Sequence, residues 1–177
     1  MKEKIIFSGF GGQGILSAGL MIAESALRCG YESTFFPSYG AEIRGGTANC
    51  SVIISDSKIF SPVIDQADTL IAFNEPSITR FLGKVKDDGL VLVNSSTVKK
   101  QFDYGKRNVI KIPFDNLAIE KLGKAKFANV IVLGVFLHVK QLLKPEDMKK
   151  SIRELFEKKG EEIIALNFRA FELGYSI

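Results

Sequence analysis

Ser8-Gly9-Phe10-Gly11-Gly12-Gln13-Gly14 decides the fold, because it joins an apolar run to a segment rich in small residues. The preceding run Ile5-Ile6-Phe7 is typical of a strand covered on both faces of a sheet. Residues 14–29 predict a helix that stops at Gly30. A strand, a glycine turn and a helix in this order aim free N–H groups and the positive end of the helix dipole at the turn, so we expect an anionic ligand there. The candidate contacts are Gly9, Gly11, Gly12, Gln13 and Gly14.

The spacing of Gly9, Gly11 and Gly14 also matches G-x-G-x-x-G, the dinucleotide-binding turn of a Rossmann unit. Such a site needs an acidic residue at the end of the second strand to bind the ribose hydroxyls. Here the predicted second strand, residues 33–36, leads into Pro37-Ser38-Tyr39-Gly40, and Glu32 lies before it. An NAD-dependent oxidoreductase is therefore a weak alternative. A turn that serves helix packing alone is another, although Gly12 and Gln13 exceed what packing requires.

Composition indicates one globular domain over residues 1–177, since 46% of the residues are hydrophobic and 25% are charged. The net charge of +4 is spread along the chain, with one loose basic cluster over residues 99–111. Nucleic-acid binding is not expected, because no basic stripe with interleaved aromatic residues occurs.

Cys29 and Cys50 are the only cysteines, too few for an iron–sulfur cluster or a Cys-rich zinc site. We expect both to be buried in a reducing compartment and the chain to hold no metal. No signal peptide precedes the first apolar run, and no apolar run of about 18 residues occurs. These features predict a cytoplasmic protein with no membrane contact.

The hydrophobic pattern predicts an α/β, three-layer Rossmann-like fold, with a mostly parallel sheet that carries an antiparallel hairpin and has helices on both faces. The hairpin is assigned to residues 47–54 and 58–60, and further strands to 69–73, 89–93 and 109–113. Helices are expected over residues 63–67, 75–82, 115–122, 129–143, 145–160 and 161–173. The last helix carries more apolar surface than one contact requires, which fits either a subunit interface or a cap on the core. His138, the only histidine, is predicted to lie in the core.

The residues after the second strand form a second candidate site. Glu42 and Arg44 lie in a segment of glycines and polar residues that we expect to point towards the glycine turn. The guanidinium of Arg44 suits a phosphate or a carboxylate, whereas a surface ion pair between the two is the plainer interpretation. Asn74 and Asn94 both follow strands, at the sheet edge where open α/β folds bind ligands. Helix capping explains Asn74 equally well.

Over nearly its whole length the chain resembles the gamma subunit, or gamma domain, of 2-oxoacid:ferredoxin oxidoreductases. The resemblance lies in Gly9-Phe10-Gly11-Gly12-Gln13-Gly14, the run from Pro37 to Cys50, Ser61-Pro62 and Phe73-Asn74. The run from Pro37 to Cys50 is most similar to the 2-oxoglutarate type, whose gamma subunit is a separate chain. Pyruvate, branched-chain and indolepyruvate types are the alternatives. Ala41 departs from the pattern, which has a proline there.

The resemblance implies a multisubunit enzyme that decarboxylates a 2-oxoacid on thiamine diphosphate with Mg²⁺, passes electrons through iron–sulfur clusters to ferredoxin and transfers the acyl group to coenzyme A. It implies alpha and beta partner subunits, with or without a ferredoxin-like delta subunit. Those cofactors must belong to the partners, since this chain lacks cluster cysteines and a Gly-Asp-Gly thiamine motif. No catalytic residue is assigned, and no activity is expected of the chain alone.

The role that remains is to complete the active site and to help bind coenzyme A, through the glycine turn, Glu42, Arg44 and Asn74. A stand-alone nucleotide-binding module is the alternative from another class. Such a module would bind its ligand tightly as an isolated chain, whereas a gamma subunit would bind weakly.

Overall fold

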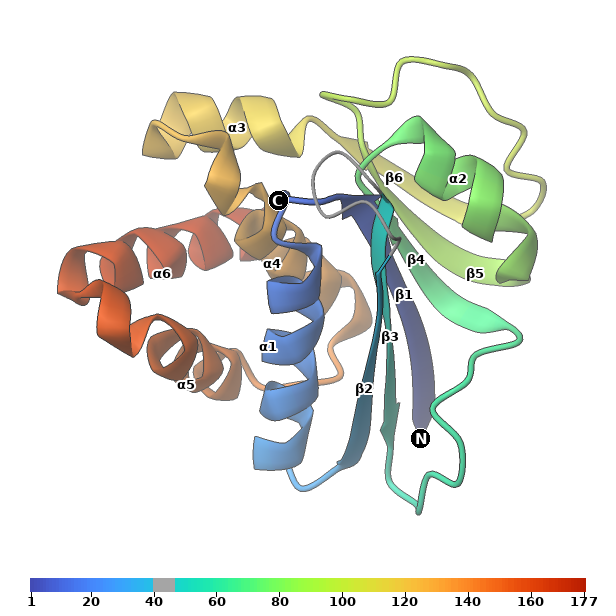
Figure 1. The fold of residues 1–177 in the computed structure, drawn as a ribbon, viewed down its shortest axis with the longest axis horizontal. Coiled ribbons are helices and arrows are strands. Elements are labelled where there is room, and N and C mark those ends of the chain that lie inside the picture. The colour runs from blue at the N-terminus through green and yellow to red at the C-terminus, as the bar shows by residue number, and fades with distance from the viewer. Residues whose placement is uncertain (40–46) are drawn as a thin grey trace.

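One six-stranded mixed sheet forms the centre of the computed structural model, which describes residues 1–39 and 47–177 (Figure 1). The strands are β1 (Lys2–Phe10), β2 (Glu32–Tyr39), β3 (Thr47–Ser55), β4 (Ala67–Ala72), β5 (Val85–Asn94) and β6 (Asn108–Ile112). The α-helices are α1 (Ile15–Arg28), α2 (Glu75–Phe81), α3 (Phe114–Leu122), α4 (Ala128–Lys140), α5 (Pro145–Phe156) and α6 (Glu161–Tyr175). The short 3₁₀ helices are η1 (Leu82–Lys84), η2 (Ala125–Phe127) and η3 (Glu157–Lys159).

The strands lie in the order β2-β3-β1-β4-β5-β6. β1, β4, β5 and β6 are successive parallel neighbours, whereas β3 runs antiparallel to both β1 and β2. The predicted α/β fold, with a mostly parallel sheet that carries an antiparallel pair, is therefore confirmed.

The predicted partner of β3 was wrong. Residues 56–66 contain no strand, and no helix forms over residues 63–67. Instead β3 lies between β1 and β2, where Cys50 pairs with Phe7 and Val52 pairs with Phe35. Alternation of polar and apolar residues indicates a strand with two different faces, but it does not say which strand lies beside it.

The two faces of the sheet are covered unequally (Figure 1). A helical layer of α1, α3, α4, α5 and α6 encloses the larger core on one face. On the other face, the smaller core lies under α2 and the coil segments 56–66 and 95–107. Helices thus lie on both faces, as predicted.

The nearly all-apolar segment predicted as a helix is α4, which lies between the sheet and α6. Every residue from Ala128 to Leu137 is buried, which explains why no polar face interrupts the sequence. α6 turns Ile164 and Phe171 inward and caps this core. The prediction for His138 was wrong, since burial stops after Leu137 and the exposed imidazole lies edge-on against Tyr175.

No single helix in the described part of the chain is long and apolar enough to cross a bilayer. One pair, Phe114–Leu122 with Ala125–Lys140, reaches that length only together and is bent by 117°.

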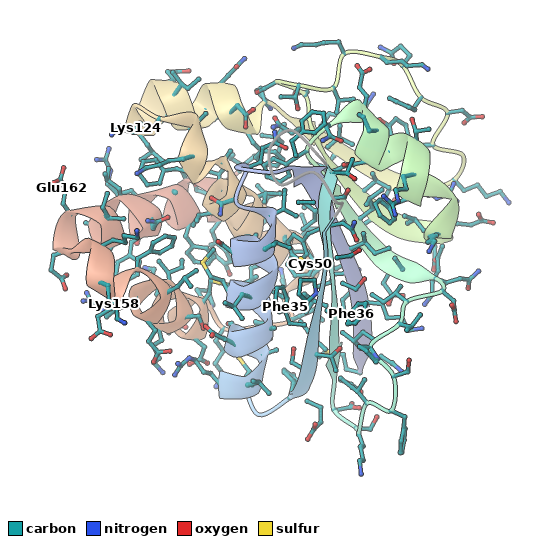
Figure 2. The ribbon with its side chains drawn as sticks, in the orientation of Figure 1. Phe35, Phe36, Cys50, Lys124, Lys158 and Glu162 are labelled. Carbon is teal, nitrogen blue, oxygen red and sulfur yellow. The ribbon has the colours of Figure 1, made fainter. Side chains whose placement is uncertain are left out.

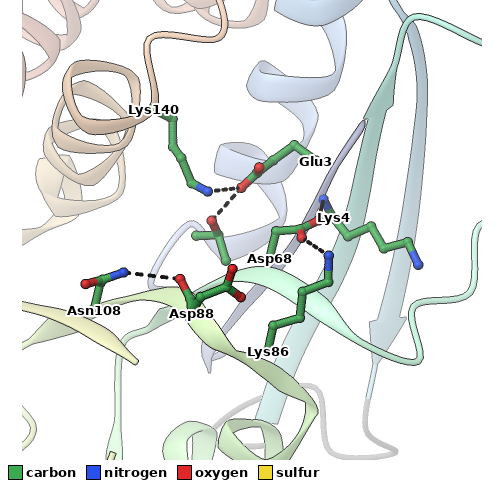
Figure 3. Close-up of polar contacts among 8 residues, drawn as sticks. Glu3, Lys4, Asp68, Lys86, Asp88, Asn108 and Lys140 are labelled. Carbon is green, nitrogen blue, oxygen red and sulfur yellow. Dashed lines mark hydrogen bonds and ion pairs between the residues drawn. The ribbon is translucent and has the colours of Figure 1, made fainter. Parts of the chain in front are cut away.

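A polar cluster lies at the edge of the sheet where β1 begins, opposite to the glycine turn (Figure 3). The Glu3 side chain is only 8% exposed, and its Oε1 lies 2.8 Å from Lys140 Nζ. The same oxygen accepts a hydrogen bond from Thr69 Oγ1 at 2.6 Å. Asp68 pairs with Lys86 nearby. The cluster ties the C-terminal end of α4 to β1 and β4.

Lys140→Met is expected to lower the free energy of unfolding by about 1–2 kcal/mol, because it leaves the Glu3 carboxylate buried without a cation. The Lys140 side chain is 23% exposed, which keeps the effect below that of a fully buried pair. Lys149→Met is the control, since it removes a surface pair with Glu172 and should cost less than about 0.5 kcal/mol. Urea unfolding of both variants provides the measurement, and equal losses would contradict a special role for Glu3.

Candidate functional site

The candidate site lies at the edge of the sheet where the helices that follow β1 and β4 go to opposite faces. β1 and β4 are parallel neighbours, with Ser8 opposite Ala72. α1 leaves β1 towards the helical layer, whereas α2 leaves β4 towards the other face (Figure 1). The carboxyl ends of β1 and β4 therefore diverge at a topological switch point, where open α/β sheets form a ligand crevice. The glycine turn and Asn74 meet at this point.

The glycine turn is closed by its own backbone and by one side chain. The backbone N–H of Gln13 donates to the carbonyl oxygen of Phe10 at 3.3 Å. In return, Gln13 Oε1 accepts a hydrogen bond from the N–H of Phe10 at 2.7 Å. The side-chain carbonyl of the predicted contact Gln13 therefore holds the turn together and is not free for a ligand. Gly11 and Gly12 are exposed between these anchors.

The other two predicted glycines are packing positions. Gly9 is buried inside β1, and an added Cβ would lie 2.9 Å from Phe73 Cβ. Gly14 precedes α1 with a φ of 71°, and an added Cβ would lie 2.4 Å from Asn129 Nδ2. That amide donates to the carbonyl oxygen of Gly14 at 3.1 Å, so the start of α4 is attached to the turn.

The start of α1 is left open to an anion. No side chain caps it, and its first turn carries no acidic residue. The free N–H groups and positive dipole end of a 14-residue helix are therefore unopposed at the turn. This arrangement fits the predicted phosphate-facing role.

Asn74 is confirmed as the N-cap of α2. Its Oδ1 accepts hydrogen bonds from the Ser77 N–H at 2.8 Å and the Ser77 hydroxyl at 2.6 Å. Ser8 Oγ lies 2.8 Å from the same hydroxyl. Asn74 is 2% exposed, and its Nδ2 has no hydrogen-bond partner among the residues described. One buried donor therefore remains to be satisfied.

Glu42 and Arg44 lie outside the described residues, so their predicted contacts are not placed. The strands that flank their segment are described: Tyr39 ends β2, and Thr47 begins β3 opposite Phe10. The segment therefore starts and ends at the sheet edge that carries the glycine turn.

Topology weakens the dinucleotide alternative further. In a Rossmann unit the second strand lies beside the first, so its acidic residue reaches the ribose next to the glycine turn. Here β3 separates β1 from β2, which moves the end of β2 about 5 Å further away. No acidic residue stands between Ser33 and Tyr39 either.

A groove of about 520 Å³ adjoins the switch point, between α2 and the coil after β5. Its lining includes Thr47, Pro76, Arg80, Lys100 and Phe102. Two exposed cations, an aromatic ring and the Glu75 carboxylate thus line this groove.

Asn94 has a structural role. It is fully buried at the end of β5, and its Nδ2 donates to Asp115 Oδ1 at 3.0 Å. Burial raises the pKa of Asp115, and this hydrogen bond partly offsets the rise. The contact ties β5 to α3.

Sequence reasoning missed Asn129 and Ser77. The signal for Asn129 was an amide at the start of an otherwise apolar helix. For Ser77 it was the spacing of three residues after an N-cap asparagine. Their partners Gly14 and Ser8 lie far away along the chain, so the contacts themselves could not be read.

The two cysteines do not fit an iron–sulfur cluster. Cys29 is half-buried after α1, whereas Cys50 is fully buried in β3. Within residues 1–39 and 47–177, no three His, Cys, Asp or Glu side chains gather in a way that could hold a metal ion. Burial raises the pKa of Cys50 from 9.0 to about 12. Burial also raises the pKa of Cys29, and a hydrogen bond to Asp147 adds to that rise.

A thiol reagent at pH 8 is expected to modify Cys29 slowly and Cys50 only after denaturation. The thiolate is the reactive form, and the folded Cys50 keeps its proton up to about pH 12 whereas an unfolded thiol loses it near 9.0. For the same reason, the stabilisation from Cys50 is complete below pH 9.0 and is lost as the pH rises towards 12. Cys29→Ser should leave no thiol reactive in the native chain. Equal labelling rates for both thiols would contradict the burial of Cys50.

The chain is similar to known proteins over nearly its whole length. The model of the pyruvate ferredoxin/flavodoxin oxidoreductase family matches residues 4–177. The ketoisovalerate oxidoreductase subunit VorA of Methanothermobacter thermautotrophicus is 38% identical over 174 residues, which are 98% of this chain and 36% of that protein. The chain thus spans about a third of the length of this curated relative.

Two solved structures have the same fold. The gamma subunit of a keto/oxoacid ferredoxin oxidoreductase from Geobacter sulfurreducens PCA has a TM-score of 0.83 at 30% identity, covering 98% of this chain and 96% of that one. A 2-oxoglutarate:ferredoxin oxidoreductase from Magnetococcus marinus, with 2-oxoglutarate, coenzyme A and succinyl-CoA bound, has a TM-score of 0.89 at 28% identity. That match covers 99% of this chain and 30% of the Magnetococcus chain.

Proposed function

The chain belongs to the pyruvate ferredoxin/flavodoxin oxidoreductase family, and we propose that it is the gamma subunit of a 2-oxoacid:ferredoxin oxidoreductase. In this role residues 1–177 form one domain that completes the active site and helps to bind coenzyme A. The complex oxidises a 2-oxoacid and produces an acyl-CoA. The electrons pass to ferredoxin through partner chains.

The observation that carries the proposal is the uncapped start of α1 at the glycine turn. Coenzyme A carries phosphates, and an uncapped helix N-terminus with exposed glycines lets them approach the backbone closely. Asn74 caps α2 at the same switch point, and its buried Nδ2 has no hydrogen-bond partner among the residues described. The proposed contacts are Gly9, Gly11, Gly12, Gln13, Gly14, Glu42, Arg44 and Asn74. Gly9 and Gly14 contribute by shaping the turn.

The redox and thiamine chemistry is assigned to partner chains. Cys29 and Cys50 lie on different elements and cannot supply the four thiolates of a cluster. Thiamine diphosphate, Mg²⁺ and the clusters would therefore be held by alpha, beta and delta-type subunits. This chain supplies phosphate-binding donors and one wall of the shared cavity.

We infer that the substrate is 2-oxoglutarate. The run from Pro37 to Cys50 is most similar to that type, and the Magnetococcus structure of the same fold is a 2-oxoglutarate enzyme. A branched-chain 2-oxoacid is the main alternative, since the VorA relative is a ketoisovalerate oxidoreductase subunit.

The test is to purify the chain at native expression from its own cells and to identify the proteins that accompany it. Coenzyme A-dependent dye reduction is then assayed with 2-oxoglutarate, pyruvate, 2-oxoisovalerate and indolepyruvate. Co-purifying thiamine and ferredoxin-like chains, with a preference for 2-oxoglutarate, would support the proposal in full. A chain that elutes alone and binds a nucleotide tightly would instead indicate a stand-alone module.

Arg44→Ala is expected to lower the coenzyme A-dependent rate of the complex at least about tenfold, because a charge-assisted hydrogen bond is worth about 1.5–3 kcal/mol. The free energy of unfolding should change by no more than about 0.5 kcal/mol. Lys158→Ala is the control, since Lys158 is exposed in η3 on the helical layer (Figure 2). Equal losses of folding and activity in the Arg44 variant would count against a binding role.

A further inference from the structure

Asn129 is a buried polar side chain in a segment that is otherwise without one. It is the second residue of α4, it is 5% exposed, and all its neighbours from Ala128 to Leu137 are apolar or glycine. A buried amide costs free energy unless it is hydrogen-bonded. α4 does not use this amide for its own end, since its N-cap is Phe127 and no side chain caps the helix. The amide of Asn129 therefore serves another element.

That element is the glycine turn. Asn129 Nδ2 donates to the carbonyl oxygen of Gly14 at 3.1 Å, from a position 115 residues further along the chain. Gly14 has a φ of 71°, and an added Cβ there would lie 2.4 Å from the same nitrogen. The contact is thus possible only because residue 14 has no side chain. Glycine makes the room at this point, and asparagine supplies the donor.

The carbonyl group of Gly14 is held by two donors. The N–H of Ala18 donates to it at 3.0 Å, as the first hydrogen bond of α1, and Asn129 provides the second. The peptide bond between Gly14 and Ile15 is planar and trans, so its N–H points away from its carbonyl oxygen. Holding the carbonyl therefore also fixes the direction of the Ile15 N–H, which is one of the donors left without a partner at the start of a helix.

α4 is a firm support for this contact, whereas the turn is not firm by itself. The backbone of α4 touches that of α6 at Gly134 and Gly174. Gly14 follows the exposed Gly11 and Gly12, and glycine adopts many backbone conformations at little cost. With the Ala18 N–H alone, the peptide group after Gly14 would take up more orientations. Asn129 restricts them by fixing the turn to the buried helical layer.

We propose that Asn129 is a positioning residue for coenzyme A, an inference that rests on the proposed function. It acts through the Gly14 carbonyl, which directs the Ile15 N–H at a phosphate group of coenzyme A. A donor that is already oriented binds more tightly, because nothing has to be ordered when the ligand arrives. The phosphates are remote from the reacting thiol, so the contact contributes to the binding of coenzyme A and not to the chemical step.

The experiment uses the whole complex, captured through a tag on this chain, and measures dye reduction at varied coenzyme A and varied 2-oxoacid. Asn129→Ala and Asn129→Leu both remove the donor, and leucine keeps the buried volume. The KM for coenzyme A should rise about tenfold in each variant, because a hydrogen bond to a charged group is weakened. The kcat and the KM for the 2-oxoacid should stay within about twofold of the wild type.

Asn167→Ala is the matched control. Asn167 is 2% exposed in α6, and its Nδ2 donates to the carbonyl oxygen of Ile163 in the same helix at 2.8 Å. This variant also loses one hydrogen bond from a buried asparagine to a backbone carbonyl. Urea unfolding should show similar losses of stability in Asn129→Ala and Asn167→Ala, whereas the KM for coenzyme A should rise only in the Asn129 variants.

The outcomes separate this proposal from the proposed function. A rise in KM for coenzyme A that is no larger in the Asn129 variants than in Asn167→Ala overturns the positioning role alone. Equal rises in KM for both substrates, or failure of both Asn129 variants to join the complex, would also overturn it, since Asn129 would then support the fold in general. A wild-type complex whose dye reduction does not depend on coenzyme A overturns the proposed function itself.

Discussion

Gly174→Ala is expected to destabilise the chain by about 3 kcal/mol, although alanine is the better helix former by about 1 kcal/mol. The reason is the contact between α6 and α4, whose backbones touch at two glycines. An added Cβ at Gly174 would lie 1.9 Å from the carbonyl oxygen of Ile131. At Gly134 it would lie 2.2 Å from the carbonyl oxygen of Phe171. Both clashes involve backbone atoms, so relief requires that the helices separate.

Gly83→Ala is the matched control for this prediction. An added Cβ at Gly83 meets nothing within 4 Å, and its φ is not left-handed. This variant should be neutral or slightly stabilising, because alanine restricts the unfolded chain more than glycine does. Urea unfolding of the isolated variants measures both effects. A neutral Gly174→Ala would mean that α6 does not pack on α4 as described.

Gly14→Ala is expected to lower the free energy of unfolding by about 2–3 kcal/mol and the coenzyme A-dependent rate of the complex at least about tenfold. A left-handed φ of 71° costs a residue with a Cβ about 1–2 kcal/mol. The new methyl group would also push against Asn129 Nδ2 and break the hydrogen bond that attaches the turn to α4. The start of α1 would then move relative to the ligand, and small displacements of a binding group reduce rates strongly.

Gly12→Ala separates the effect of backbone strain from the effect of the clash with Asn129. Its φ of 93° carries a similar backbone strain, but an added Cβ there meets nothing within 4 Å. It should cost only about 1–2 kcal/mol.

The double variant Gly14→Ala with Asn129→Ala tests the contact between the two residues. Because Asn129→Ala removes the clash, the double variant should lose less stability than the sum of the losses in the two single variants. Strict additivity would show that Asn129 does not position the turn.

Local patterns predicted much of the candidate site. The glycine turn, the helix that begins after Gly14 and the N-cap at Asn74 depend on residues within a few positions of one another, so their chemistry is readable from spacing. The same is true of α5, which begins at Pro145 with acidic residues in its first turn, as predicted. The resemblance rested on such runs, and the family match over residues 4–177 agrees with it.

The wrong predictions concern spatial neighbours, which the pattern of polar and apolar residues does not specify. Residues 47–54 were recognised as a strand, but their neighbours are β1 and β2 and not residues 58–60. Residues 58–60 form no strand, and Phe60 is 90% exposed. His138 is predicted to lie in the core because it belongs to a nearly all-apolar segment, whereas burial in α4 stops after Leu137.

By itself, the sequence determined the order and kind of most elements, the glycine turn between β1 and α1, and the absence of cluster-forming cysteines. These properties depend on composition and on contacts between neighbours in the chain. Only the tertiary structure decided that β3 separates β1 from β2, that Asn129 holds Gly14 and that Lys140 neutralises Glu3. Each of these joins residues distant along the chain, and such contacts are selected by the packing of the whole domain, because no local preference distinguishes one distant partner from another.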